Sequence, residues 1–218
     1  MVPLALGYCL AGVGIVAGLG CMATVNLQVM SMGLIYVALN IGYSLGLKNV
    51  SVVDLLIVAA GFMLRAYAGV FAVPTTPSVW FSLMALFGSL LLVGGKRSGE
   101  RSVATDGSSG ATRKVQAKYT DSYLQFVREF SAAGLVMAYA LMAYQKSEIV
   151  TGAAEAAIQI SIVPFLATVM LLVKRMDEGG GAAPEELVLK DRAVLISGFL
   201  WVVCFAASVY LSSDATGI

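Results

Sequence analysis

The chain has 218 residues, of which 59% are hydrophobic and only 12% are charged, whereas roughly a quarter of the residues in soluble domains are charged. Its 14 basic and 13 acidic residues leave a formal net charge of +1, so no overall positive field favours a nucleic-acid partner. The sequence contains no histidine, which excludes imidazole bases, Ser-His-Asp triads and histidine-ligated zinc. Three cysteines without C-x-x-C spacing predict neither a disulfide framework nor a thiolate metal site.

Apolar segments of about 20 residues, the length that crosses a bilayer as a helix, follow one another along the whole chain. Short polar or proline-bearing breaks separate them. The sequence therefore predicts an all-α, polytopic transmembrane helical bundle, in which residues 1–218 form a single membrane domain. The seven predicted spans are Val2–Met22, Leu27–Leu47, Val50–Val73, Ser78–Gly95, Ser122–Tyr144, Ala156–Val173 and Ala193–Leu211.

The basic residues are distributed unevenly between the two sides of the predicted membrane domain. One side receives 12 of the 14, whereas Lys146 lies on the other side and Arg65 within a span. Lysine and arginine accumulate in cytoplasmic loops, so the loops Lys96–Asp121 and Lys174–Arg192 are predicted to face the cytoplasm, with the protein in the plasma membrane. Ten of the 13 acidic residues share that side. A face rich in both signs indicates either a binding surface for a charged ligand or a topology signal alone.

Two basic clusters end apolar segments on this predicted cytoplasmic side. The stretch from Tyr43 to Lys48 places a phenol one turn inside the membrane and an ammonium at its rim, where both can reach one phosphate. The stretch from Phe87 to Lys96 and Arg97 ends in a point charge beside a forked donor, after two glycines. Interfacial anchoring and a stop-transfer boundary are the alternatives. Their shared side favours one anionic ligand for both clusters.

Arg65 lies within the third predicted span, eleven residues after Asp54. Eleven residues are close to three helical turns, so both side chains lie on one face, roughly 16 Å apart along the axis and too far to pair. An arginine at that depth normally faces the interior of a bundle and has a partner. Arg65 is therefore predicted either to orient a ligand or to pair with a carbonyl or an acid elsewhere.

The segment Tyr43–Ala72, with the sequence YSLGLKNVSVVDLLIVAAGFMLRAYAGVFA, resembles the UbiA superfamily of intramembrane prenyltransferases. It is most similar to the decaprenyl-phosphate phosphoribosyltransferase branch of that superfamily. The likeness continues in Trp80–Arg97, Lys118–Val127 and Pro184–Arg192, so it covers essentially the whole chain.

The resemblance implies transfer of 5-phosphoribose from phosphoribosyl pyrophosphate to decaprenyl (polyprenyl) phosphate, for cell-wall arabinan precursor synthesis. It also implies a nine-helix fold with a cytoplasm-facing polar cavity open to membrane lipid, and Mg²⁺ on the pyrophosphate. No catalytic residue or metal ligand is assigned. The predicted substrate-binding residues are Tyr43 and Lys48 on one phosphate, Lys96 and Arg97 on a second, Arg65, and Asp191 with Arg192 at the cytoplasmic rim.

The sequence departs from the superfamily in one respect, because it lacks the Asn-Asp-x-x-Asp-x-x-x-Asp motif that holds Mg²⁺ in its members. The start at Val2 and Pro3 resembles the loop after that motif, so the first two family helices are expected to be absent or to come from a separate N-terminal helical segment. A UbiA-type prenyltransferase with an aromatic acceptor and a non-catalytic membrane remnant or partner subunit are the alternatives. A homo-oligomer is left open.

Overall fold

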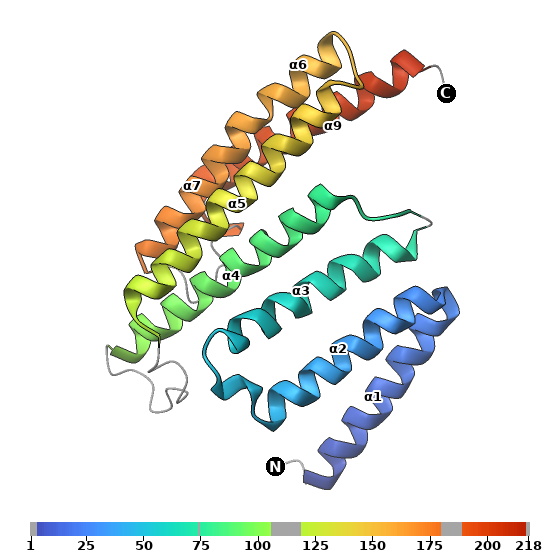
Figure 1. Cartoon of the computed structure of the whole chain (residues 1–218), viewed down its shortest axis with the longest axis vertical. Coiled ribbons are helices and arrows are strands. Elements are labelled where there is room, and N and C mark those ends of the chain that lie inside the picture. Colours follow the sequence, from blue (N-terminus) through green and yellow to red (C-terminus); the bar gives the residue numbers. More distant parts are fainter. Residues whose placement is uncertain (1–3, 74, 106–118, 180–188, 217–218) are drawn as a thin grey trace. The chain divides into compact units, whose positions relative to one another are not determined.

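The structure, a computed structural model, describes residues 4–73, 75–105, 119–179 and 189–216, and every element in these ranges is a helix (Figure 1). The chain divides into two compact units, Met1–Ala85 and Leu86–Ile218, and each unit is described by itself. The boundary between them falls within α4 (Val79–Thr105). The predicted single domain over residues 1–218 stays a prediction.

In the first unit, α2 packs against both α1 and α3 (Figure 1). Asn26 begins α2, because its side chain accepts a hydrogen bond from the N–H of Val29 at 2.8 Å. The Asn26 amide also donates to the carbonyl of Phe71 at 2.6 Å, which ties the turn between α1 and α2 to the end of α3. The elements of this unit, besides the start of α4, are α1 (Leu4–Val25), α2 (Leu27–Leu45), the 3₁₀ helix η1 (Leu47–Asn49) and α3 (Val53–Ala72).

In the second unit, an aromatic core joins α5, α7 and α9. The ring of Tyr139 stacks on Phe165 with centroids 4.1 Å apart and meets Trp201 edge-on at 5.8 Å. The Tyr139 hydroxyl lies 2.7 Å from the Ser161 hydroxyl, which satisfies both buried groups. The helices of this unit, besides the end of α4, are α5 (Asp121–Ser147), α6 (Ala153–Ile160), α7 (Ile162–Asp177) and α9 (Arg192–Thr216).

Glycines bring α4 close to its neighbours in the second unit. A Cβ atom on Gly134 of α5 would lie 2.6 Å from the ring of Phe87 on α4. A Cβ atom on Gly95 of α4 would lie 2.6 Å from the sulfur of Met176 on α7. The absence of side chains at these two positions therefore permits the close approach that membrane helices use when they pack.

The predicted all-α, polytopic membrane class is confirmed. Within the described residues, six helical segments are long and apolar enough to cross a membrane, and the apolar part of α1, Cys9–Val25, is a shorter seventh. Large apolar side chains are exposed, among them Val16 at 73% and Phe199 at 71%. Apolar surface of this extent indicates contact with lipid or with other membrane helices.

The structure differs from the predicted helices in two places. The fourth helix does not end at Gly95 but continues to Thr105, because a helix can run past its apolar part when charged residues pair along it, as Arg97 and Glu100 do. The span predicted over Ala156–Val173 lies within one membrane-crossing segment, Ala153–Asp177, which a break at Ser161 divides into α6 and α7. Pro164 explains this break, since proline has no N–H to donate to the preceding turn.

Candidate functional site

The segment from Tyr43 to Lys48 forms the end of α2 and the start of η1. Gly46 ends α2 at a φ of 156°, a conformation that favours glycine, and its N–H bonds to the carbonyl of Gly42. Lys48 follows in η1, where its side chain is half-buried. The sharp turn therefore places this lysine at the end of the α2–α3 hairpin, as the sequence predicts.

The hydroxyl of Tyr43 donates a hydrogen bond to Oδ1 of Asp54 at 2.8 Å. Asp54, in the first turn of α3, is fully buried, with 0% of its surface exposed. A buried carboxylate needs such donors, so the phenol proton is already engaged within the fold. A direct bond from Tyr43 to a phosphate stays a prediction, and Lys48 is the cation beside it.

Arg65 has neutral partners within the part of the chain that the structure describes. Its Nη1 donates to the Tyr36 hydroxyl on α2 at 3.1 Å, and its guanidinium lies 4.5 Å from the ring centroid of Phe62 and 5.4 Å from that of Tyr36. The partner is thus a phenol, neither the carbonyl nor the acid that pairing would predict. Arg65 is exposed and lines a cavity of about 240 Å³ among α1, α2 and α3.

Lys96 and Arg97, adjacent on α4, have opposite surroundings. Arg97 is only 5% exposed and forms an ion pair with Glu100 at 2.7 Å. Lys96 is exposed and has no hydrogen bond or ion pair with any residue that the structure describes. Of the two predicted phosphate ligands on α4, Lys96 is therefore the one that a soluble anion can reach.

Sequence reasoning missed two ion pairs that fix the same end of the second unit. Arg128 of α5 is 6% exposed and donates both to the Ser98 hydroxyl on α4 and to the Asp177 carboxylate on α7. Arg101 of α4 pairs with Asp121, the first residue of α5, at 2.6 Å. These bonds join three helices. The available signal was an isolated arginine seven residues into an apolar helix, which the sequence alone does not distinguish from a rim charge.

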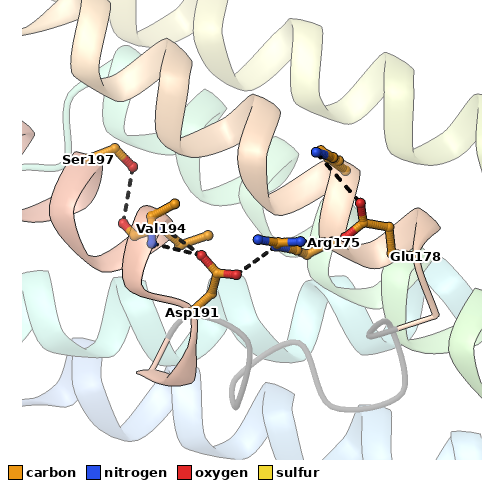
Figure 2. Close-up of polar contacts among 7 residues, drawn as sticks. Arg175, Glu178, Asp191, Val194 and Ser197 are labelled. Atoms are coloured by element: carbon orange, nitrogen blue, oxygen red, sulfur yellow. Dashed lines mark hydrogen bonds and ion pairs between the residues drawn. The ribbon is translucent and has the colours of Figure 1, made fainter.

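Asp191 has a structural role at the start of α9 (Figure 2). Its Oδ1 accepts the N–H groups of Ala193 at 2.9 Å and Val194 at 3.1 Å, and its Oδ2 lies 2.6 Å from Nε of Arg175. The N–H of Val194, then that of Ala193 and the charge of Arg175, lower the pKa of Asp191. The position of Asp191 at a cytoplasmic rim stays a prediction, and Arg192 beside it is exposed.

Arg175 also binds Glu178, with Nη1 and Oε2 2.6 Å apart (Figure 2). The hydrogen bond from Arg175 is the main cause of a lowered pKa at Glu178, and the charge of Lys174 adds to it. Arg175 therefore links the end of α7 to the start of α9 through Asp191, while Glu178, the C-cap of α7, binds the same guanidinium. This cluster, Arg175, Glu178 and Asp191, holds the two helix ends together.

The described residues do not fit a Mg²⁺ site by themselves. No three His, Cys, Asp or Glu side chains among them come within reach of one ion. A Mg²⁺ ion usually takes one or two carboxylates together with substrate phosphates, but most carboxylates in this part of the chain already bind tyrosine, arginine, lysine, glutamine or backbone N–H groups. No step is therefore assigned to the metal.

The structure brings some predicted site residues into defined positions without joining the two clusters. Tyr43 and Lys48 belong to the first unit, whereas Lys96 and Arg97 belong to the second. Their convergence on one ligand stays a prediction. Residues 106–118 and 180–188, which contain part of the two predicted cytoplasmic loops, lie outside the described residues.

These features define an integral membrane protein with accessible cations suited to anionic ligands. No known protein-family profile matches the chain. Proteins named decaprenyl-phosphate phosphoribosyltransferase are similar to it: one from Corynebacterium glutamicum is 37% identical over 96% of this chain and 63% of its own length. Relatives of that name from Mycolicibacterium smegmatis and Mycobacterium tuberculosis are 35% and 33% identical over 97% and 96% of this chain, and each is covered over 68% of its length.

The chain belongs to the decaprenyl-phosphate phosphoribosyltransferase family. This membership agrees with the resemblance to the UbiA superfamily that the sequence indicates. The chain spans between 63% and 68% of the length of these curated relatives.

Proposed function

We propose that this protein transfers 5-phosphoribose from phosphoribosyl pyrophosphate to decaprenyl or another polyprenyl phosphate, as a transferase of cell-wall arabinan precursor synthesis. The observation that carries the proposal is the similarity, over 96–97% of the chain, to relatives whose name states this transfer and this lipid. The half-buried Lys48 and the exposed Lys96, both at the ends of apolar segments, support it, because both substrates are phosphates.

The chemistry of the transfer explains which groups it needs. A phosphate oxygen of the lipid forms a bond to C1 of the ribose while the bond from C1 to the pyrophosphate oxygen breaks, and the pyrophosphate leaves with that electron pair. A phosphate monoester is mostly ionised at neutral pH, since its second pKa is about 6, so no side chain has to remove its proton. Positioned cations that stabilise the charge of the leaving pyrophosphate are the main requirement.

Lys48 and Lys96 are the residues that we assign to the donor phosphates. Lys48 lies in η1 at the end of the α2–α3 hairpin, Lys96 lies where the apolar part of α4 ends, and both side chains are accessible to an anion. Arg97 and Asp191 support the site indirectly in this proposal, because Glu100 and Arg175 already bind them. The Mg²⁺ expected from the resemblance, a separate N-terminal helical segment and a homo-oligomer belong to the same proposal.

A transfer assay tests the proposal. Membranes that contain the chain receive decaprenyl phosphate and phosphoribosyl pyrophosphate labelled in the ribose, with and without a co-expressed helical hairpin that carries the family's Asp-rich motif. We expect labelled lipid when the hairpin is present and little label without it. Strong transfer by the 218 residues alone would contradict the need for the hairpin. Transfer from a labelled prenyl pyrophosphate to an aromatic acceptor, or no transfer at all, would contradict the proposed function.

Cysteine labelling tests the proposed cytoplasmic face in the plasma membrane. In a chain without its three native cysteines, a thiol reagent that cannot cross the membrane should label Thr151→Cys from outside the cell. The same reagent should leave Asn49→Cys, beside Lys48, unlabelled until the membrane is opened. The reverse pattern would contradict the orientation, since it would place Lys48 outside.

A further inference from the structure

Arg65 is a charge inside the membrane-spanning part of α3. At a rise of 1.5 Å per residue, it lies roughly 18 Å from the first residue of α3, Val53, and roughly 10 Å from the last, Ala72. Its guanidinium lies over the ring of Phe62, one turn closer to the start of the helix, so it does not extend towards the nearer helix end. A cation held at this depth is costly and generally marks a functional site.

The surroundings of Arg65 stabilise a cation without neutralising it. Among the described residues, its partners are the Tyr36 hydroxyl at 3.1 Å and the faces of the Phe62 and Tyr36 rings. The two rings attract a cation, and the phenol can accept only one of the five N–H groups of a guanidinium. Arg65 therefore keeps N–H groups for an anion that enters the cavity that it lines.

The cavity beside Arg65 is lined by apolar residues except for Arg65 itself and Tyr36. Its volume of about 240 Å³ is below the roughly 300–1,000 Å³ typical of sites that enclose a whole small molecule. It is thus suited to a headgroup and the first part of a chain, with the remainder in the bilayer. Glycines and flexible methionines from α1 and α2 form much of its wall, among them Gly14, Gly18, Met22 and Met32.

We infer that this cavity binds the phosphate of a polyprenyl monophosphate, with the guanidinium of Arg65 on the phosphate and the first isoprene units along the apolar wall. Charge complementarity selects the ligand, because a guanidinium fork matches phosphate oxygens and no described carboxylate neutralises it. Of the two proposed substrates, only the lipid brings a phosphate attached to an apolar chain. The inference rests on the proposed function, and assigns Arg65 to the acceptor while Lys48 and Lys96 serve the donor.

Binding of a short lipid phosphate, measured without the donor, tests the inference. Farnesyl phosphate and its uncharged counterpart farnesol are titrated into the purified chain in nanodiscs. We expect Arg65→Gln to weaken farnesyl phosphate binding roughly tenfold to hundredfold, the loss typical of a charge-assisted hydrogen bond, and to leave farnesol binding unchanged. Lys146→Gln is the matched control, since Lys146 is also a cation over a ring, 5.1 Å from the centroid of Phe205, and should change neither affinity.

Arg65→Lys keeps the charge and tests the fork alone. It should lower the preference for farnesyl phosphate over farnesol about tenfold, because a point charge cannot bind two phosphate oxygens in parallel. If Arg65→Gln does not fold, Arg65→Lys still tests whether Arg65 binds the lipid phosphate. An unchanged preference in Arg65→Lys, or an equal loss of both ligands in Arg65→Gln, would overturn the inference.

The two claims fail separately in these experiments. A chain that binds farnesyl phosphate through Arg65 but transfers no phosphoribose contradicts the proposed function alone. A chain that transfers phosphoribose while Arg65→Gln binds farnesyl phosphate as the unchanged protein does contradicts this inference alone.

Discussion

Arg65 in α3 of the first unit and Arg128 in α5 of the second unit both lie within apolar helices, and they have different partners. In the second unit, Arg128 is buried and donates to the carboxylate of Asp177 and to Ser98, so it joins α4, α5 and α7. In the first unit, Arg65 is exposed beside a cavity and contacts only a phenol and two rings among the described residues. The charge of Arg128 is paired with a carboxylate of the fold, whereas the charge of Arg65 has only neutral partners among the described residues.

The difference separates a structural charge from a ligand-binding charge. A buried ion pair is satisfied by its own partner, and breaking it destabilises the fold. A membrane cation with neutral partners retains donors for an anion that arrives from elsewhere. We therefore expect changes at Arg128 and its partners to alter stability, and changes at Arg65 to alter binding.

The largest stability effect is expected from Asp177→Ala. Removing this carboxylate takes the ionic partner from a buried guanidinium and leaves it the Ser98 hydroxyl. We expect a loss of about 2 kcal/mol in the free energy of unfolding, below the usual 3–5 kcal/mol for a fully buried pair, because the Asp177 side chain is 50% exposed. Unfolding in mixed detergent micelles measures it. The matched control, Lys174→Ala, removes an exposed charge 3.7 Å from Glu178 and should change little.

The double variant Arg128→Met with Asp177→Asn sharpens the same comparison. Replacing both members of a buried pair costs less than removing one, so this chain should be more stable than Asp177→Ala. Equal or greater destabilisation would show that the pair does not act as a unit.

A pair of glycine substitutions compares helix packing in the two units. Gly134→Ala places a methyl group 2.6 Å from the Phe87 ring and should destabilise the second unit by about 1–2 kcal/mol. Gly69 of α3 has nothing within 4 Å of its Cβ position, so Gly69→Ala should stabilise the chain by roughly 0.5–1 kcal/mol through helix propensity. Thermal unfolding of both variants gives the signs, and two losses of similar size would contradict the difference in packing.

The smallest effect is a pH dependence that arises in the second unit. The backbone N–H groups of Val194 and Ala193, together with Arg175, lower the pKa of Asp191 in the fold. The hydrogen bond from Arg175 lowers the pKa of Glu178. Their stabilisation is therefore complete above the ordinary carboxyl pKa of about 4 and is lost as the pH falls through the lowered values. Asp191→Asn can still cap α9 but loses the charge, so its unfolding temperature should fall less between about pH 6 and about pH 3. Equal falls in the unfolding temperature of the variant and of the unchanged protein would contradict the lowered pKa of Asp191.

The sequence was sufficient for the membrane class, because uncharged apolar segments of bilayer length are typical of membrane-spanning helices. It was not sufficient for helix ends, since hydropathy follows the membrane whereas a helix follows its hydrogen bonds. The helix α4 passes Gly95 for this reason. The break at Ser161 was accessible in principle, because Pro164 was visible in the sequence and marks a lost backbone bond.

Only some features of the candidate site could be predicted from the sequence. Lys48 and Lys96 could be placed at the ends of apolar segments, because the position of a charge beside an apolar run follows from the sequence. The engagement of Asp191 with Arg175, and of Arg128 with Asp177, could not, since the second pair is 49 residues apart and no spacing rule joins residues on separate helices.

The central claim, that Lys48 and Lys96 bind a phosphorylated sugar donor, is tested most directly by donor affinity. Phosphoribosyl pyrophosphate is titrated into the active complex of the unchanged protein and of Lys48→Ala, Lys96→Ala and Lys146→Ala. The account predicts a roughly tenfold to hundredfold loss of affinity in each of the first two, the size of a lost charge-assisted hydrogen bond, and no change in Lys146→Ala. Unchanged donor affinity in both Lys48→Ala and Lys96→Ala would contradict it.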